Sequence, residues 1–539
     1  MRRLSHFVAL VALLIFLTPF AAPGLPGAAD ASAAQPDELG KVSFPTSCAP
    51  EAQPTLERAV ALLHSFQYTE SEQIFSDAAK QDPHCAMAQW GKAMARYHQL
   101  WDFPQAGTLQ QGLADIQEAQ KIGAATERER GYIAVAAAFY QDNPKLSHAE
   151  RTGAYSAALA QLHAQSPEDV EASAFYALSL VALADVDHVD DLANRKKAIA
   201  ILDPLFRQHP DDPGAAHYLI HAADVPELAP QGLEAARHYA KIAPDSSHAL
   251  HMPSHIFTRL GLWQESIASN IAASASAEHA IAGHHAEAHY QTHAMDFLDY
   301  AYLQSGQEAR AKHVAEDEMR VPGASEEDKL DHQAIVLARN AIELRHWKEA
   351  AALAVPAIRP VWQDTTYFAR AIGAARSGDT AAARSAVGKL TEVVSAREAR
   401  SRKEGYEVSA EKASDLREAE AWLAFAEGKG SAALEQMRAA ASREDAKGIE
   451  NLAVPAREML ADMLLELKKP AEALAAYELA LKDSPNRFDA LYGAAHAAQA
   501  AGNSSAAQSF YAKLRAISGP GADRSELAET KSYLARKSN

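Results

Sequence analysis

The segment PAEALAAYELALKDSPNRFDALYGAAHAAQAAGNSSAAQSFYAKL, residues 470–514, decides the fold. Ala473 and Tyr477 are followed by Ala507 and Tyr511, so the Ala-x3-Tyr pair recurs after 34 residues. Apolar residues at helical spacing fill the unit, and Pro or Gly interrupts them. The segment therefore predicts a pair of helices that repeats along the chain.

This unit resembles the tetratricopeptide repeat, a helix-turn-helix with an Ala-x3-Phe…Pro signature. Near the other end of the chain, FQYTESEQIFSDAAKQDPHCAMAQWGKAM (66–94) fits the same frame, with Ser71, Phe75 and Pro83. Further copies of the turn are RLGLWQESIASN (259–270), QSGQEARA (304–311), LRHWKEAAALA (344–354), RSGDTAAARSA (376–386) and EGKGSAALEQM (427–437). The resemblance implies an all-α, tetratricopeptide-repeat-like helical solenoid, a right-handed superhelix with a concave inner surface.

The first 33 residues predict a cleaved secretory signal peptide. Arg2 and Arg3 precede the apolar run FVALVALLIFL (7–17), and AADASAAQ (28–35) offers small residues for cleavage. No later stretch reaches 18 unbroken apolar residues, so we expect no membrane span and a periplasmic or secreted protein. In such a compartment Cys48 and Cys85, the only two cysteines, indicate one disulfide.

Composition divides the remaining chain into two repeat blocks. We expect a linker at 34–45, a first block at 46–318, the polar linker MRVPGASEEDK at 319–329 and a plainer second block at 330–539. The net charge of −18 would repel phosphate backbones, so we expect no nucleic-acid partner. The stretches FPTSC, DPHCAMAQWGKAM, HYLIHAAD and HMPSHIFTRLG resemble a His-rich group of exported bacterial repeat proteins. That resemblance implies fold and export and supplies no activity.

Histidines gather in one part of the first block. Thirteen of the 23 lie between His209 and His313, and surplus histidine is a compositional sign of metal binding. Three H-x3-H pairs, which place both imidazoles on one helix face, follow one another at steps of 34 residues: His217/His221, His251/His255 and His285/His289. The register of the third pair is open, because counting back from Gly306 aligns His293 with His248 instead.

The histidine pattern predicts a transition-metal site, with zinc, copper or iron as the cofactor. We expect His217, His221, His251 and His255 as principal ligands, completed by His293, His289 or His248. Asp224, three residues after His221, is predicted as a ligand or as a residue that orients one. No Glu follows the first His of a pair, which argues against a zinc-protease mechanism. Further binding residues expected in the same groove are His98, Trp101, Arg259 and His285.

Two functions follow from this inventory. The first is a periplasmic or secreted metal-binding protein, extended to a metalloenzyme that acts on a small molecule in the groove. The second is a non-catalytic scaffold that binds a peptide or protein partner, with the histidines as polar lining. Arg259 fits both hypotheses, because it could hold an anionic group or form a salt bridge across the groove.

Overall fold

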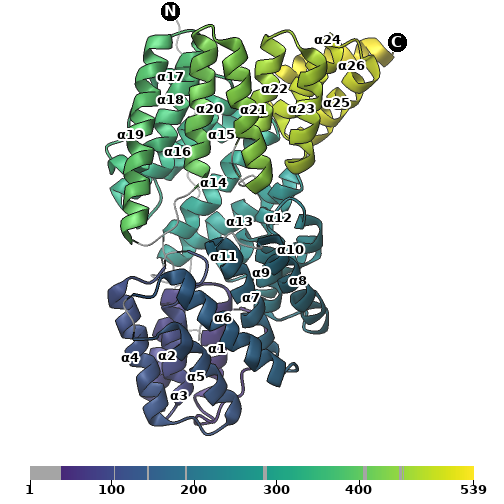
Figure 1. Ribbon diagram of the computed structural model, residues 1–539. Coiled ribbons are helices and arrows are strands. Elements are labelled where there is room, and N and C mark those ends of the chain that lie inside the picture. The colour runs from purple at the N-terminus through teal and green to yellow at the C-terminus, as the bar shows by residue number, and fades with distance from the viewer. Residues whose placement is uncertain are drawn as a thin grey trace, which may run out of the picture. The chain divides into compact units, whose positions relative to one another are not determined.

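The computed structural model describes residues 38–101, 103–142, 145–187, 191–282, 288–404, 410–447, 452 and 454–538. Within these ranges every regular element is a helix, so the predicted all-α, tetratricopeptide-repeat-like solenoid is confirmed (Figure 1). The predicted signal peptide and His285 lie outside the described residues. In the described part, no helix is both long and apolar enough to cross a bilayer.

Each helix packs mainly on its neighbours in sequence, as helical hairpins do. The first half of the chain contains α1 (Gln53–His64), α2 (Tyr68–Gln81), α3 (Ala86–Ala95), α4 (Ala106–Ile122), α5 (Glu127–Phe139), α6 (His148–Gln165), α7 (Val170–Asp187), α8 (Asp191–Gln208), α9 (Pro213–Ala223), α10 (Ala229–Ile242), α11 (Ser247–His251), α12 (Pro253–Arg259) and α13 (Trp263–Ala282). The second half contains α14 (His289–Gln304), α15 (Glu308–Glu318), α16 (Glu326–Glu343), α17 (Trp347–Ala352), the short 3₁₀ helix η1 (Pro360–Trp362), α18 (Asp364–Ser377), α19 (Thr380–Glu404), α20 (Ala410–Ala426), α21 (Gly430–Lys447), α22 (Ala456–Glu466), α23 (Pro470–Asp483), α24 (Phe488–Ala500), α25 (Ser504–Ile517) and α26 (Glu526–Ser538).

The turn inside these hairpins requires one residue in the left-handed region. Gly261, Gly306 and Gly378 occupy it with φ of +64°, +74° and +86°, which glycine adopts at little cost. In the turn between α1 and α2 the same hydrogen-bond pattern places Phe66 there, with φ of +55°. A bulky side chain with positive φ is uncommon, so its ring must gain contacts that offset the cost.

Residues 38–45, part of the expected linker, contain no helix or strand and lie as a strap on the helices. Phe44 is completely buried, and its ring stacks on Trp90 with centroids 5.1 Å apart. The Lys41 amide donates to the carbonyl oxygen of Asp211 at 2.9 Å. Apolar side chains in this segment hold it on the surface because they leave water when they pack.

The strap is also tied covalently to the start of α3. Cys48 and Cys85 form a disulfide, as the sequence predicts, with Cα atoms 4.7 Å apart. Ser47 adds a polar tie, because its amide donates to Glu129 Oε1 at 2.7 Å. The segment before α1 is therefore fixed at several points.

The expected linker at 319–329 lies within one compact unit. Residues 319–325 form the turn between α15 and α16, and Val314, Val321 and Val336 share one apolar cluster across it. From Glu38 onward the chain forms a single compact unit. The polar residues of this segment indicate a turn and not a boundary, because the apolar cluster continues on both sides of it.

Candidate metal centre

Four elements carry the histidines that the structure brings together. His217 and His221 lie on α9, His248 and His251 on α11, and His255 on α12. The local sequence fixes where α9 begins, because Asp212 caps it by accepting from the Ala215 amide at 2.8 Å and Pro213 suits the first helical position. The sixth histidine, His293, comes from α14.

The helix that was expected to carry His251 and His255 is broken between them. Helix α11 ends at His251 and α12 begins at Pro253, because proline has no N–H to bond the carbonyl four residues earlier. The chain still turns in a helical sense at Met252. The two imidazoles therefore face the same side, with their Nε2 atoms 3.0 Å apart.

The six histidines form two sets of three. We call His217, His221 and His248 the first triad, and His251, His255 and His293 the second triad. In each triad one ring nitrogen from every residue lies within 4.8 Å of the others. The sequence predicted a single shell around the two H-x3-H pairs. The structure instead gives one pair to each triad and completes each with a histidine from another element.

The first triad is buried and its protons can be assigned. His217 Nδ1 lies 2.6 Å from the carbonyl oxygen of His64, so Nδ1 donates and Nε2 of the neutral ring keeps its lone pair. That Nε2 faces Nε2 of His248 at 3.1 Å. The buried Nε2 of His221 has no hydrogen-bond partner. Burial lowers the pKa of His217 to about 3, so the ring is neutral, which is the form that binds metals.

The second triad is oriented by two residues behind it. His251 Nδ1 donates to Asn270 Oδ1 at 2.7 Å, and Asn270 is fixed because its amide nitrogen donates to the Ser266 carbonyl at 2.9 Å. His255 Nδ1 donates to Asp224 Oδ2 at 2.8 Å. Both Nδ1 protons are thus used, and the Nε2 atoms are left facing each other. Metal-binding histidines commonly use their other nitrogen in this way.

Asp224 therefore contacts the Nδ1 side of His255, which is a candidate ligand. Of the two roles predicted for Asp224, this position fits orienting a ligand. Its second carboxylate oxygen accepts from Arg259 Nε at 3.0 Å. Arg259 also donates to the Asp224 carbonyl oxygen at 3.3 Å. The structure thus gives Arg259 a salt bridge to Asp224, one of the two roles that the sequence left open.

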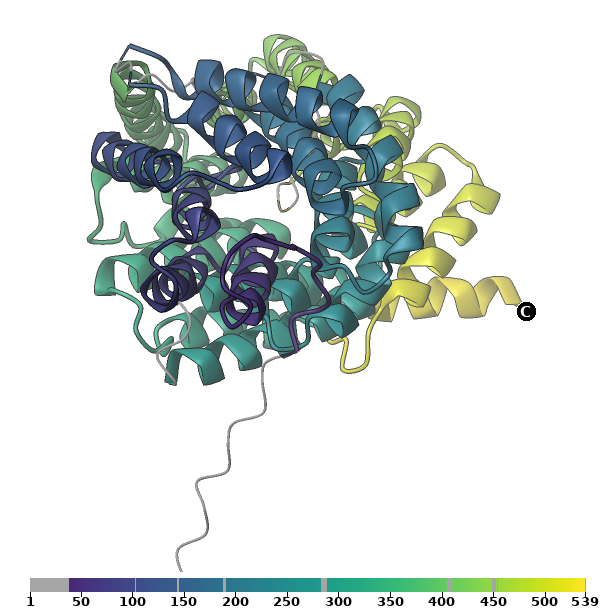
Figure 2. The same ribbon diagram turned by 90° about the horizontal axis from the view of Figure 1, so that it is seen from below.

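Aromatic side chains cover the first triad. The ring centroid of Phe66 lies 4.5 Å from that of His217 and 5.4 Å from that of His221. Trp101, a predicted binding residue, lies 5.9 Å from His221. The Tyr290 hydroxyl, on α14, donates to the Phe66 carbonyl at 2.7 Å and so joins distant parts of the chain. Figure 2 shows these parts as purple N-terminal helices beside teal helices. The histidines of this triad are enclosed, whereas the sequence placed them along an open groove.

The second triad is more open. His293 is exposed, and the side chain of His255 is 13% exposed. Phe297, one turn after His293, packs against this triad with its ring 4.5 Å from that of His255. The second triad is therefore exposed to solvent at His293.

The remaining predicted residues take other places. His98 stacks on Tyr68 with centroids 4.3 Å apart, and the exposed His289 stacks on Tyr290 at 4.1 Å. Neither belongs to a triad. Of the three histidines proposed to complete the shell, His248 and His293 are both used, one in each triad.

Phe66 and Asn270 are parts of the centre that the sequence did not predict. Buried His64 presents its carbonyl to His217, and its Nε2 lies 2.6 Å from Glu171 Oε2. Burial lowers the pKa of His64, but the Glu171 carboxylate raises it by more, so the pKa lies above its ordinary 6.5. Phe66 had a sequence signal, since an aromatic residue stands where the turns at Gly261, Gly306 and Gly378 carry glycine.

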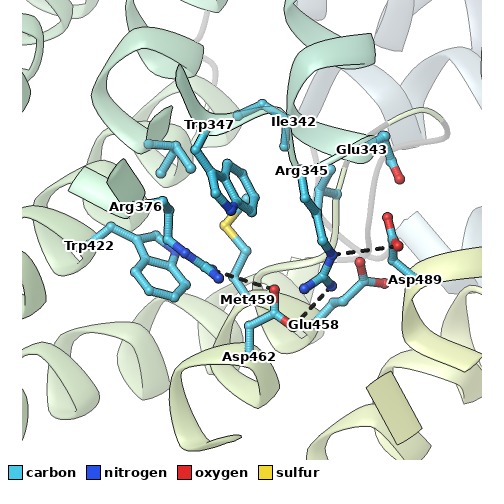
Figure 3. A pocket seen from close by; sticks show the side chains of 12 residues that line it. Ile342, Glu343, Arg345, Trp347, Arg376, Trp422, Glu458, Met459, Asp462 and Asp489 are labelled. Carbon is cyan, nitrogen blue, oxygen red and sulfur yellow. Dashed lines mark hydrogen bonds and ion pairs between the residues drawn. The ribbon is translucent and has the colours of Figure 1, made fainter. Parts of the chain in front are cut away.

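A pocket in the C-terminal half is lined by charged side chains that form ion pairs with one another (Figure 3). The guanidinium carbon of Arg376 lies 4.5 Å from the ring centre of Trp347 and 4.0 Å from that of Trp422. Asp462 accepts from Arg345 at 3.1 Å and lies 3.6 Å from Arg376. The charges of these cations are therefore balanced by carboxylates within the pocket.

The fold and the triads together define an all-helical repeat protein with a largely buried polyhistidine centre. No family model and no curated protein matches the chain. It is similar to solved structures of helical-repeat proteins. A human IFIT1 dimer with m7Gppp-AAAA is 12% identical, with a TM-score of 0.37 over 85% of this chain and 95% of that one. The Cut9–Hcn1 complex of APC/C is 11% identical, with a TM-score of 0.33 over 90% and 89%. The P58(IPK) TPR domain is 13% identical, with a TM-score of 0.23 over 84% and 99%.

One prediction from the sequence is wrong in its reasoning: the acidic net charge was taken to exclude a nucleic-acid partner. Net charge is a sum over the whole chain and does not fix the potential inside one groove. The charge of −18 therefore does not exclude nucleic acid.

Proposed function

We propose that this protein binds a transition-metal ion, zinc, copper or iron, through its histidine triads. The observation that carries the proposal is the 3.0 Å approach of His251 Nε2 to His255 Nε2, while Asn270 and Asp224 take up the Nδ1 protons. A neutral imidazole has one donor and one acceptor nitrogen. Two neutral rings arranged in this way direct their Nε2 lone pairs at each other, and the lone pairs repel. A cation bound between the two Nε2 atoms would remove this repulsion.

The donor set fits such an ion. Imidazole nitrogen suits zinc, copper and iron, and each triad supplies three ring nitrogens within 4.8 Å of one another. The partnerless, buried Nε2 of His221 supports the same conclusion, because an unsatisfied buried polar atom costs free energy. One protonated ring could also explain a short Nε2–Nε2 contact, so the test must detect the metal itself.

Catalysis on a small substrate is the extension of this proposal that we favour. Three protein ligands with a free position are typical of catalytic zinc sites, whereas structural zinc sites have four. The exposure of His293 to solvent supports an open position at the second triad. When bound, the metal would polarise a substrate or activate water. The histidines do not support the scaffold hypothesis. Five of the six are not exposed, so they cannot line a surface that binds a peptide or protein.

The test is the metal content of the mature chain, residues 34–539, purified without an affinity tag or chelator. We expect at least one transition-metal ion per chain, and we expect the ion to remain bound during gel filtration. The double variant His251→Ala/His255→Ala is expected to lose the ion from the second triad without losing helical content. His238→Ala is the matched control, because His238 is exposed on α10 and bonds only within its own helix. Unchanged metal content in the double variant would remove the proposal for that triad.

We also propose that the protein works outside the cytoplasm. The Cys48–Cys85 disulfide supports this, because such bonds persist in oxidising compartments. N-terminal sequencing of protein made from the full-length chain in a bacterial host is expected to begin near residue 34. A chain that still begins at Met1 and remains in the cytoplasm would contradict export.

A further inference from the structure

We propose that the two triads hold a pair of metal ions that share one small bridging anion, a class of ligand that includes hydroxide. The inference rests on the proposed function and goes beyond it, since that function requires only one ion. It follows from how the six ring nitrogens divide, how close the triads lie, and how little anionic charge surrounds them.

The ligand count is the first argument for two ions. Six histidines offer their nitrogens as two complete sets of three, each set within 4.8 Å. The sets have the same chemistry, since neither contains a carboxylate or a sulfur atom. Each set has one close Nε2–Nε2 pair, at 3.1 Å for His217 and His248 and at 3.0 Å for His251 and His255. In the first triad the buried Nε2 of His221 also has no hydrogen-bond partner, so each triad offers ring nitrogens that an ion would occupy.

The second argument is that the triads are neighbours. Helix α11 contributes one histidine to each, His248 and His251, whose ring centroids are 6.3 Å apart. Across the other side, the centroids of His221 and His255 are 6.4 Å apart. These separations are no larger than the 6.4 Å between His221 and His248 within the first triad. A ligand of one or two atoms could therefore contact both ions, as in known two-metal sites.

Charge is the third argument and favours an anion as the shared ligand. Six neutral imidazoles leave the charge of two cations uncompensated in a buried place, which is costly. Two carboxylates lie beside the second triad, and both are engaged away from its metal-facing side. Asp224 contacts Nδ1 of His255, and Asp296, one turn after His293, forms an ion pair with Arg339 at 2.7 Å. Glu171 is further removed, behind His64. A small anion between the ions would supply the missing negative charge.

The triads also differ in access, so the two ions should exchange at different rates. The three histidines of the first triad are buried under Phe66, which keeps a left-handed backbone at a position where other turns carry glycine. The second triad has the exposed His293. We expect a chelator to remove one ion quickly and the other slowly. Phe66→Gly, which suits the turn, should speed the slow phase at least tenfold.

The experiment loads the mature chain with Cu²⁺ and, separately, with Zn²⁺, and counts bound ions. Two ions per chain are expected for the native protein, one for His221→Ala in the first triad, one for His293→Ala in the second, and two for the His238→Ala control. If circular dichroism shows that His221→Ala does not fold, His221→Gln replaces it. One ion in the native protein would overturn the pair and leave the proposed function standing. No bound ion would overturn both.

The shared anion is tested by electron paramagnetic resonance of the copper-loaded protein. Two Cu²⁺ ions joined by a bridging anion couple, so the signal should correspond to far fewer than two spins per chain. Each single-triad variant should return close to one spin per chain, because its remaining ion has no neighbour. A full two spins in the native protein would overturn the shared anion.

Discussion

Replacing Arg487 by Met is expected to lower the free energy of unfolding by about 3–5 kcal/mol, the usual cost of removing one partner from a buried ion pair. Arg487 is completely buried. Its guanidinium donates to both carboxylate oxygens of Glu343 at 2.9 and 3.0 Å, and to Glu458 at 2.8 Å. The variant would leave two buried carboxylates without their cation.

The same guanidinium links distant parts of the chain. It donates to the Tyr300 hydroxyl on α14 at 2.6 Å, while Glu343 ends α16 and Glu458 lies on α22. Nearby, the Phe488 amide donates to Gln304 Oε1, also on α14, at 2.9 Å. Because α14 carries His293, the C-terminal helices support the second triad.

Urea unfolding followed by circular dichroism measures the effect. The urea midpoint of Arg487→Lys should lie between those of Arg487→Met and the native protein, since lysine keeps the charge but lacks the planar guanidinium group. Arg515→Met is the matched control, because Arg515 is exposed on α25, and should change little. Adding Glu343→Gln and Glu458→Gln to Arg487→Met should recover stability. If Arg487→Met unfolds at the native urea concentration, the buried network contributes no net stability.

Replacing Glu318 by Gln is expected to stabilise the protein by about 3 kcal/mol at pH 7. Glu318 ends α15, is completely buried, and neither of its carboxylate oxygens has a hydrogen-bond partner. Burial raises its pKa from 4.5 to about 9, and the Asp296 and Asp299 carboxylates add to the increase. The side chain is therefore neutral in the folded protein at pH 7.

The sign of the pH dependence follows from this difference. Above pH 4.5 the unfolded chain releases the proton from Glu318, whereas the folded chain keeps it up to about pH 9. The unfolded state then binds fewer protons, so this residue makes stability fall as pH rises across that window. Glu318→Gln should remove the fall, and its advantage over the native protein should vanish near pH 4.5.

Urea midpoints at pH 5, 7 and 8.5 test the expectation. Glu316→Gln is the matched control, because the Glu316 side chain is 60% exposed on the same helix, and should leave the pH profile unchanged. A Glu318→Gln profile parallel to the native one would mean that the Glu318 carboxyl titrates alike in the folded and unfolded chains. The result bears on the metal centre, since Asp296 lies one turn from His293 on α14.

Periodicity predicted the fold and four of the six histidines of the candidate centre. The 34-residue step at Ala473 and Ala507 predicted hairpins that the structure confirms. The H-x3-H spacing likewise brought His217 to His221 and His251 to His255, because residues four apart share a helix face. It failed in treating 251–255 as unbroken helix, since Pro253 ends the hydrogen-bond ladder there, and in expecting His289 among the ligands, since His289 belongs to neither triad.

The sequence by itself determined an all-helical repeat chain with paired histidines, because turn residues and apolar spacing act within one hairpin. Only the tertiary structure decided that the histidines divide into two triads, completed by His248 and His293. It also decided that Phe66 covers one triad and that Asn270 and Asp224 orient the other. These contacts join residues up to 224 positions apart, as between Tyr290 and Phe66. Which side chains meet over such separations depends on how successive hairpins pack, which no local pattern encodes.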